Sequence, residues 1–393
     1  MKIVILNKGK DKSLSRLHPW LFSGAIVKKD KDIKEGDVVK VLSYDNNYLA
    51  TGYYQNETIA VKILSFDNET IDQKFFDKRI SCAVEYRKTM GLFGDGENTI
   101  FRLINAEGDF LPGLIADYYD GNIVVQFHSI GMYLMREYIV NALKTNLHSL
   151  KTIFSKSSST LPKGSEVLPK DEFLYGNCDE QTFVAKENGI KFLIDYKQGQ
   201  KTGFFIDQQS NRSLVSLLSK DKTVLNCFGY TGGFSLAALK GEAKRVETLD
   251  ISKRALEICE KNVEMNGYTS RHISQCEDVV KFIDSISANT YDMIILDPPA
   301  FAKHQRDLQR ALKGYRAINQ KAMEKIKSGG LLFTFSCSQA VSREDFSTML
   351  FSCAALAKRK VRIVRRLPHN FDHPQSIFHP EGEYLKGFLL YIE

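Results

Sequence analysis

Short apolar runs alternate with longer amphipathic segments through the second half of the chain, and this alternation constrains the fold more than any other feature. The expected strands are residues 223–227, 245–249, 271–275, 292–296 and 330–335. The expected helices are residues 208–219, 232–240, 252–266, 277–285, 306–327 and 342–357. Strands and helices that alternate in this way build a parallel sheet with helices on both faces. We therefore expect an α/β domain with a parallel, doubly wound sheet.

The first half of the chain has a different character. Residues 1–70 predict a small β-rich module, and residues 71–185 predict an α+β central module. With 393 residues the chain is long enough for two or three domains, so residues 186–393 are expected to form the third.

Three local features of the first half carry expectations of their own. Trp20 is the chain's single tryptophan, and we expect it to anchor the core of the β-rich module. Apolar spacing predicts one helix over residues 131–147. The segment 157–170 is rich in Ser, Pro, Gly and charge, so we expect a flexible insert there.

Composition excludes several classes of protein. No stretch approaches the ~20 apolar residues of a membrane span, and the start of the chain lacks the apolar core of a signal peptide. The seven cysteines form no Cys-x-x-Cys pair, so neither a zinc site nor a disulfide framework is expected. We predict a reduced, cytoplasmic protein with no metal and no membrane partner.

Positive charge is concentrated in two runs. The net charge of +7 is too small to indicate a nucleic-acid partner by itself. Residues 303–327 follow an Asp-Pro-Pro turn, and residues 358–366 form a denser basic run. Such runs are either solvated helix faces or contacts to phosphates. The position of the first run favours phosphate contacts and makes Lys303, Arg306 and Arg310 candidate RNA-binding residues.

A glycine-rich loop, residues 226–234, follows the first strand of the expected sheet. Glycines let backbone approach a ligand and let the next helix pack on the sheet. The Gly-x-x-Gly-Gly spacing is a weak match to a dinucleotide loop and discriminates poorly by itself. Upstream, Phe204 and Phe205 are expected either to flank the ligand or to belong to a hairpin packed on the sheet.

Acidic residues follow consecutive strands of this sheet. Asp250 ends the second strand, Glu277 and Asp278 follow the third, and Asp297 ends the fourth. Taken singly, each acid fits a helix N-cap, above all Asp250 and Asp278. Taken together, they predict acceptors for a ribose, an adenine edge and a cationic amino group. Binding of a dinucleotide needs only the acid that bonds the ribose, so acids after three consecutive strands favour S-adenosylmethionine.

Asp297 and Cys337 form the most informative pair. The acid and two prolines end one buried strand, and the thiol ends the next. If these strands are neighbours in a parallel sheet, the two residues meet at its carboxyl edge, where open α/β sheets bind ligands. A carboxylate beside a thiol suits covalent chemistry on a polarisable ring. Taken alone, Cys337 also fits a buried apolar thiol, a description that suits Cys227 well.

Several segments together resemble the RlmI-type class I methyltransferases, which methylate C5 of a cytosine in bacterial 23S ribosomal RNA. These segments are residues 201–208, 228–234, 296–301, 335–338 and 380–388. The resemblance covers the whole chain, because residues 1–70 are similar to the family's PUA module and residues 102–115 to its central module. It implies a PUA-like RNA-binding module, an α+β central module at 71–185 and a Rossmann-like methyltransferase domain at 186–393.

The resemblance also implies S-adenosylmethionine as methyl donor and 23S ribosomal RNA, free or in a large-subunit precursor, as partner. The oligomeric state stays open, a homodimer included. The implied catalytic residues are Cys337, as nucleophile, and Asp297 beside donor and target. The implied cofactor-binding residues are Lys201, Phe204, Gln208, Asn226, Phe228, Gly229, Tyr230, Thr231, Gly232, Gly233, Asp250, Ser252, Glu277, Asp278 and Asp297. The implied RNA-binding residues are Arg16, Lys303, Arg306 and Arg310.

These assignments predict a covalent route. C5 of cytosine is a weak nucleophile, but a Cys337 thiolate that adds to C6 makes C5 enamine-like and able to take a methyl group. Asp297 is expected to bond the N3/N4 edge of the base. Other RNA cytosine-C5 methyltransferases carry a second cysteine after an Asp-x-Pro, where this chain has Ala300. The group that removes the C5 proton is therefore unassigned.

Three other functions stay open at this point. A methyltransferase that acts on a nitrogen of guanine or adenine also uses an Asp-Pro-Pro turn, and Cys337 would then be incidental. A non-catalytic RNA-binding or ribosome-assembly protein would explain the first module and the basic runs but not the line of acids. A nicotinamide dehydrogenase would leave the Asp-Pro-Pro turn and Cys337 unexplained.

Overall fold

The computed structural model describes residues 1–94, 96–162, 167–302 and 304–393, and the chain divides into two compact units. Unit 1 consists of Met1–Lys186, Ile194–Gly203 and Phe371–Gly382. Unit 2 consists of Glu187–Leu193, Phe204–Asn370 and Glu383–Glu393. The three modules expected along the chain, with boundaries at residues 70 and 185, stay a prediction. Residues 163–166 of the expected flexible insert and Lys303 of the expected RNA-binding set lie outside the described residues.

Unit 1 begins with a six-stranded sheet in the order β2-β6-β5-β4-β1-β3. Its strands are β1 (Lys2–Leu6), β2 (Trp20–Phe22), β3 (Ile26–Lys29), β4 (Val38–Leu42), β5 (Tyr48–Tyr54) and β6 (Ile59–Ser65), and the short helix α1 (Lys12–Ser15) lies between β1 and β2. The core of this module contains Val39, Val41 and Val61 but not Trp20. Trp20 is half-buried, and its indole N–H donates to Glu107 Oε1 at 2.9 Å. The expectation of a tryptophan core anchor is wrong, because the indole needs a polar partner.

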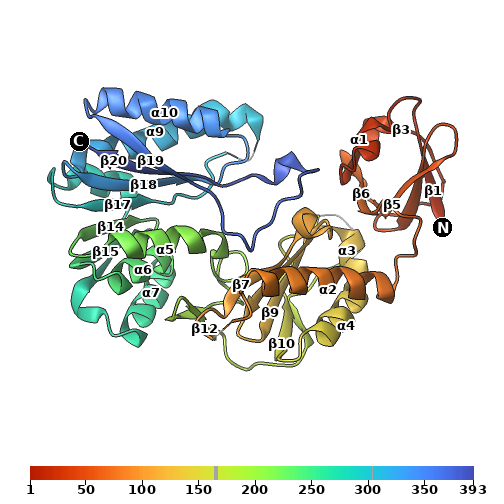
Figure 1. Cartoon of the computed structure of the whole chain (residues 1–393), viewed down its shortest axis with the longest axis horizontal. Helices are drawn as coiled ribbons and strands as arrows, with labels where there is room; N and C mark the ends of the chain where they lie inside the picture. Colours follow the sequence, from red (N-terminus) through yellow and green to blue (C-terminus); the bar gives the residue numbers. More distant parts are fainter. Residues whose placement is uncertain (95, 163–166, 303) are drawn as a thin grey trace. The chain divides into compact units, whose positions relative to one another are not determined.

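A second, five-stranded sheet of unit 1 has the order β11-β10-β9-β8-β7. Its strands are β7 (Ile100–Asn105), β8 (Leu114–Tyr119), β9 (Asn122–Phe127), β10 (Thr152–Ser155) and β11 (Glu172–Tyr175), and its helices are α2 (Gln73–Thr89), α3 (Ile130–Leu134) and α4 (Arg136–Asn146). The single helix expected over 131–147 is therefore two helices that meet at Met135. The fold of this module brings α2 and α4 together beside the sheet (Figure 1).

The segment Phe371–Gly382 belongs to unit 1 although the chain on both sides of it belongs to unit 2. Asp372 Oδ2 accepts from the Arg102 backbone N–H at 2.8 Å, and the Asp372 carbonyl accepts from the buried Arg87 guanidinium at 2.8 Å. Hydrogen bonds to charged groups are the stronger ones. Contacts between residues this far apart in sequence cannot be read from local patterns.

Unit 2 contains a seven-stranded sheet in the order β16-β15-β14-β17-β18-β20-β19. Its strands are β14 (Thr223–Cys227), β15 (Arg245–Asp250), β16 (His272–Cys276), β17 (Met293–Leu296), β18 (Gly330–Ser336), β19 (Val361–Leu367) and β20 (Lys386–Ile392). Outside this sheet, β12 (Phe183–Glu187) and β13 (Ile190–Ile194) form a two-stranded ribbon, and the chain passes from unit 1 to unit 2 near the end of β12. The five expected strands are all present, and the Rossmann-like α/β fold is confirmed.

The sheet of unit 2 is mixed rather than wholly parallel. Strands β14 to β18 are parallel to their neighbours, but β20 runs antiparallel to both β18 and β19. The expectation of a parallel sheet is correct for five strands and wrong for these two. Strand β20 is almost continuously apolar and β19 is strongly basic, so neither shows the alternation that marks a strand in a single sequence.

Helices cover both faces of this sheet. They are α5 (Gln209–Leu218), α6 (Gly233–Lys240), α7 (Lys253–Met265), α8 (Val279–Ser285), α9 (Leu308–Lys325) and α10 (Arg343–Leu356). Helices α5, α6 and α7 pack together, and α8, α9 and α10 form a second group whose apolar side chains share a core with the sheet (Figure 1). Among the described residues, every helix is too short or too polar to cross a bilayer.

Candidate active site

The carboxyl ends of β17 and β18 bring the two most informative motifs together. The strands are parallel neighbours in which Leu296 pairs with Thr334, so the expectation that they adjoin is confirmed. Asp297 follows β17 directly and is half-buried, and Cys337 follows β18 and is also half-buried. Cys337 Sγ lies 3.8 Å from the carbonyl oxygen of Pro298. The thiol is therefore next to the Asp-Pro-Pro turn without being sealed inside the protein.

Residues around Cys337 are held by several hydrogen bonds. Ser338 Oγ accepts from the Ala302 backbone N–H at 3.2 Å and shares a hydrogen bond of 2.9 Å with the Tyr315 hydroxyl. The Ser338 carbonyl accepts from Lys386 Nζ at 2.8 Å. Because Ser338 is fully buried and bonded on both its side chain and its carbonyl, the position of the preceding thiol is well defined.

The buried cysteines of unit 2 differ from Cys337. Burial raises the pKa of the Cys259 thiol to about 12 and that of Cys353 to about 11. Burial also raises the pKa of Cys227, which ends β14 inside the core. The thiolate is the nucleophilic form, so these three thiols are inert at neutral pH.

The glycine-rich loop after β14 has an unusual backbone. Phe228 and Tyr230 have φ values of 59° and 48°, and Gly232 has a φ of 87°. A Cβ on Gly229 would lie 2.3 Å from Thr248 Cγ2, and one on Gly232 would lie 2.5 Å from Cys259 Sγ. The loop therefore needs glycine at both positions, because it turns sharply and lies directly on the neighbouring elements.

Asp250 is bonded to that loop from the end of β15. Its carboxylate accepts from the Tyr230 backbone N–H at 2.9 Å and from the Ser252 backbone N–H at 2.8 Å. The N-cap of α7 is Ser252, which accepts from the Ala255 N–H, so Asp250 is not the cap. Each carboxylate oxygen keeps a further lone pair, which leaves Asp250 able to accept from hydroxyl groups of a ligand.

The two acids after β16 are exposed. Asp278 is the N-cap of α8, and its carboxylate accepts from the Lys281 N–H at 3.0 Å. The expectation that Asp278 caps a helix is confirmed. Roles for Glu277 and Asp278 at an adenine edge stay predictions.

The segment 204–208 precedes α5 and is fixed by an ion pair. Arg212 donates to both carboxylate oxygens of Glu187, at 2.6 and 2.5 Å, and to the Phe205 carbonyl at 2.7 Å. Phe204 is 3% exposed and lies under the Arg212 guanidinium, whereas Phe205 is half-buried and contacts Tyr230 edge-on. Of the two rings, only Phe205 therefore keeps a partly exposed surface.

Gln208 and Lys201 are also among the expected cofactor-binding residues, and their roles stay predictions. Gln208 is buried, and its side-chain oxygen accepts from Asn211 at 2.7 Å. Lys201 is exposed and belongs to unit 1.

The expected RNA-binding residues belong to both units. Arg306 is exposed beside the start of α9, and Arg310 on α9 is 78% exposed while paired with Asp307 at 3.0 Å. Arg16 is exposed at the end of α1 in unit 1. The second basic run lies on the edge strand β19, not on a helix, and Arg362, Arg365 and Arg366 are exposed there.

Comparisons with known proteins agree with this geometry. The profile described as S-adenosylmethionine-dependent methyltransferase matches residues 114–378, which is more than half of the chain. The chain belongs to the S-adenosylmethionine-dependent methyltransferase family. Residues 4–66 match the profile of the PUA-like domain.

Individual relatives extend the similarity to almost the whole chain. The chain is 37% identical over 396 residues to Ribosomal RNA large subunit methyltransferase I of Aeromonas salmonicida, covering 98% of each chain. It is 38% identical over 393 residues to the protein of the same name from Vibrio cholerae, again covering 98% of each. A solved structure from Streptococcus mutans, assigned as a SAM-dependent methyltransferase, has a TM-score of 0.84, 22% identity and full coverage of both chains, and it supports the fold.

The methyl donor of this family fits the residues present. Asn226 Oδ1 and Thr231 Oγ1 are buried and have no hydrogen-bond partner among the described residues. Both belong to the glycine-rich loop, so unused hydrogen-bonding capacity is concentrated where the donor is expected. Together with the half-buried Asp250 carboxylate, these atoms suit a polar ligand with amino and hydroxyl groups.

Sequence reasoning missed several side chains of the methyltransferase site. Lys386, the first residue of β20, is 3% exposed, and burial lowers its pKa to about 8. The Tyr384 hydroxyl donates to Asp207 Oδ2 at 2.7 Å, which ties the start of β20 to the segment before α5. The sequence offered one indication of these two residues, because residues 380–388 are one of the segments that carry the family resemblance. Their roles depend on the antiparallel pairing of β20, which the sequence did not indicate.

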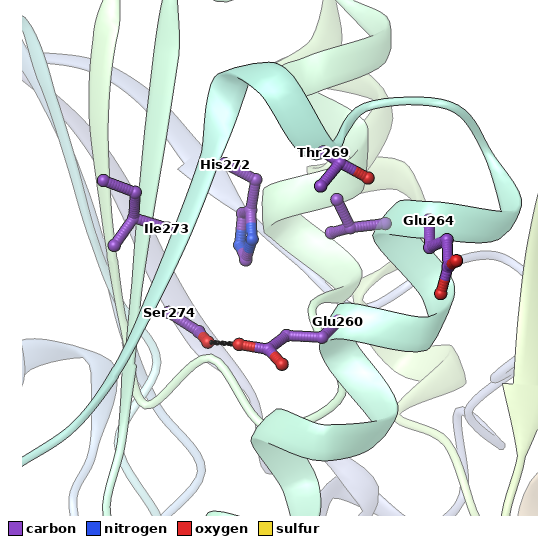
Figure 2. A pocket seen from close by; sticks show the side chains of 7 residues that line it. Glu260, Glu264, Thr269, His272, Ile273 and Ser274 are labelled. Carbon is purple, nitrogen blue, oxygen red and sulfur yellow. Dashed lines mark hydrogen bonds between the residues drawn. The ribbon is translucent and has the colours of Figure 1, made fainter.

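A cavity of about 550 Å³ lies elsewhere in the methyltransferase fold, between α7 and β16 (Figure 2). It is lined by Glu260, Val263, Glu264, Thr269, His272, Ile273 and Ser274. None of these residues ends a strand at the carboxyl edge, where the acids and Cys337 lie. The candidate site is therefore identified by its acidic residues and its thiol and not by the position of this cavity.

Proposed function

We propose that this methyltransferase forms 5-methylcytosine in the 23S ribosomal RNA of the large subunit through a covalent adduct between Cys337 and C6 of the base. The observation that carries the proposal is the half-buried thiol 3.8 Å from the Pro298 carbonyl, at the end of the strand beside Asp297. The same edge of the sheet carries the glycine-rich loop and Asp250. Nucleophile, acid and cofactor loop thus belong to one sheet edge, as a group transfer requires.

The RNA substrate is supported by the relatives and by the amino-terminal module. Two relatives with full-length similarity carry the name ribosomal RNA large subunit methyltransferase, and residues 4–66 match a PUA-like domain. Arg306 and Arg310 are exposed on the segment that follows the Asp-Pro-Pro turn. Arginines at this position suit contacts to the phosphates next to the target base.

We propose that different residues bind the ribose, the amino-acid part and the adenine of the methyl donor. S-adenosylmethionine supplies the electrophilic methyl group. Asp250 would accept from the ribose hydroxyls, the loop Phe228–Gly233 would hold the amino-acid part, and Glu277 with Asp278 would face the adenine. The fixed loop backbone contributes orientation, which lowers the entropic cost of bringing donor and base together.

The proposed chemistry assigns Cys337 and Asp297 distinct tasks. Cys337 thiolate adds to C6, which transfers electron density to C5 and lets it take the methyl group. Asp297 bonds the N3/N4 edge of the cytosine: as a carboxylic acid it donates its proton to N3 and so neutralises the negative charge that develops there as C6 is attacked. After loss of the C5 proton the thiolate leaves and the ring is restored. The base has to be single-stranded or turned out of its stack to enter.

Trapping the adduct tests this function. RNA that carries 5-fluorocytosine has no proton to lose at C5 after methyl transfer, so the enzyme and the RNA stay covalently joined and migrate together on a denaturing gel. We expect this band with the wild-type enzyme and with Cys82→Ser, a control at an exposed thiol of α2. We expect no band with Cys337→Ala and at least about a thousandfold loss of methyl transfer.

The outcomes separate the alternatives. Full methyl transfer by Cys337→Ala would favour a base-nitrogen methyltransferase. Failure of purified protein to bind S-adenosylmethionine in a calorimeter would favour a non-catalytic RNA-binding protein. Mapping 5-methylcytosine in ribosomal RNA from a strain that lacks the protein identifies the nucleotide.

A further inference from the structure

A buried lysine lies against the loop that carries Cys337. Lys386 begins β20 and pairs with Ser336, the last residue of β18. Its Nζ donates to the Ser338 carbonyl at 2.8 Å, and the side chain is 3% exposed. Lys386 therefore contacts the residues before and after Cys337, and its ammonium group interacts electrostatically with that thiol.

The burial of this ammonium group requires a nearby anion. Burying an isolated charge is costly, and a neutral carbonyl compensates only part of the cost. Cys337 and Glu383 both raise the pKa of Lys386, but burial lowers it by more. Glu383 is exposed and pairs with Arg343, which itself lowers the pKa of Lys386. Of these two groups Cys337 is the half-buried one, so its thiolate would be the anion best placed to offset the burial of Lys386.

We propose that Lys386 is the positioning residue that holds Cys337 as a thiolate. This inference rests on the proposed function, because Cys337 has to be a thiolate in order to add to C6 of the base. An opposite charge nearby favours the ionised form of a thiol. Cys337 gives its proton to solvent and Lys386 keeps its own, so the pair carries no net charge. Tyr315, whose pKa is raised by burial, stays neutral beside them.

This arrangement has a limited pH range. Burial lowers the pKa of Lys386 to about 8, so the ammonium form is dominant at neutral pH and is lost at higher pH. The thiolate is therefore favoured by Lys386 around pH 7, where an ordinary thiol with a pKa of about 8.5 is almost wholly protonated.

The test measures the thiol directly and needs no RNA. The full-length protein is treated with iodoacetamide from pH 5.5 to 9.5, and the rate at each cysteine is followed by peptide mass spectrometry. We expect Cys337 to react with a midpoint below that of Cys82, the exposed internal control. Lys386→Met should move the Cys337 profile to higher pH and slow its reaction at pH 7 about tenfold. Lys386→Arg, which keeps the charge, should restore most of the rate.

Unchanged Cys337 profiles in Lys386→Met, with normal Cys82 rates and a normal melting temperature, would overturn the proposal. If Lys386→Met does not fold, the wild-type profile decides, because a Cys337 midpoint equal to that of Cys82 overturns it as well. Adduct trapping with 5-fluorocytosine RNA keeps the two claims separate. If the wild type forms no adduct but Lys386→Met shifts the pH profile of Cys337, only the proposed function is contradicted. If the wild type forms the adduct but Lys386→Met leaves the profile unchanged, only the role of Lys386 is contradicted.

Discussion

Cys337 Sγ lies 3.8 Å from the carbonyl oxygen of Pro298, across the junction between the ends of β18 and β17. The prolines fix the backbone after Asp297, and Ser338 fixes the backbone after the thiol through its bonds to Tyr315 and Ala302. A target base that lies over this junction can meet an acid from one strand and a sulfur from the next. The contact therefore explains how two motifs that are far apart in the sequence come to lie side by side.

Replacing Asp297 by Asn tests its part in the chemistry. The amide keeps the size of the side chain but cannot give a proton to N3, so the negative charge that reaches N3 as C6 is attacked is no longer neutralised. We expect methyl transfer to fall about a hundred- to a thousandfold in single-turnover measurements on unmethylated ribosomal RNA. Binding of S-adenosylmethionine, followed by calorimetry, should change far less than the rate. Loss of both in equal measure would instead assign Asp297 to the cofactor.

The Asp250→Asn variant addresses the cofactor itself. The carboxylate is proposed to accept from two ribose hydroxyls, and a hydrogen bond to a charged acceptor contributes about 1.5–3 kcal/mol. We expect the Kd for S-adenosylmethionine to rise about ten- to a hundredfold. Asp120→Asn is the matched control, because Asp120 lies in unit 1 and pairs with an exposed lysine. An unchanged Kd for Asp250→Asn would contradict the ribose assignment.

The sequence predicted the parallel part of the sheet well, because local patterns determine it. All five expected strands exist, and the expectation that Cys337 and Asp297 end neighbouring strands was correct. The sequence did not reveal β20 or the place of Lys386, because an antiparallel return from the end of the chain depends on long-range pairing. The same reason applies to Asp372, which bonds to Arg102 within unit 1.

The sequence predicted the roles of single residues less well than it predicted the strands. Phe204 was expected either beside the ligand or in packing, and its ring is buried under Arg212. Asp278 is a helix cap, as its position also suggested. A residue type and its place in a motif do not determine which way a side chain points, so such roles need coordinates or variants.

The buried pair of Arg212 and Glu187 should matter for stability. Their side chains are 3% and 2% exposed, and the arginine also holds the Phe205 carbonyl. Arg212→Met leaves a buried carboxylate without its partner, so we expect a loss of about 3–5 kcal/mol in the free energy of unfolding. The urea midpoint of unit 2, monitored by circular dichroism, provides the measurement.

Two variants make that measurement specific. The double variant Arg212→Met/Glu187→Gln removes both charges and should recover part of the loss. Lys151→Met breaks the exposed pair with Asp120, whose side chains are 57% and 48% exposed, and should cost less than about 1 kcal/mol. Equal losses for the buried and the exposed pair would refute the argument.

His272 should make the protein less stable in mild acid. Burial lowers its pKa to about 4, so the folded protein keeps the ring neutral where the unfolded chain, with a pKa of about 6.5, takes up a proton. The stability that the neutral ring contributes is thus complete above pH 6.5 and is lost as pH falls toward 4. Between pH 7 and pH 5 the loss attributable to His272 is about 2 kcal/mol.

The structural reason is a buried chain of hydrogen bonds. His272 Nε2 lies 2.6 Å from Thr248 Oγ1, which lies 2.6 Å from Ser235 Oγ, and that hydroxyl accepts from Asn226 at 2.8 Å. With both ring nitrogens protonated, Nε2 can only donate, so Thr248 has to accept from it, and the chain is disturbed as far as Asn226 in the glycine-rich loop. In His272→Asn the difference in unfolding free energy between pH 7 and pH 5, from urea titrations, should shrink by about 2 kcal/mol. His128, an exposed residue whose pKa is also lowered to about 4, remains in both proteins, so subtraction removes its contribution. An identical acid sensitivity in wild type and variant would show that the ring at 272 is already solvated.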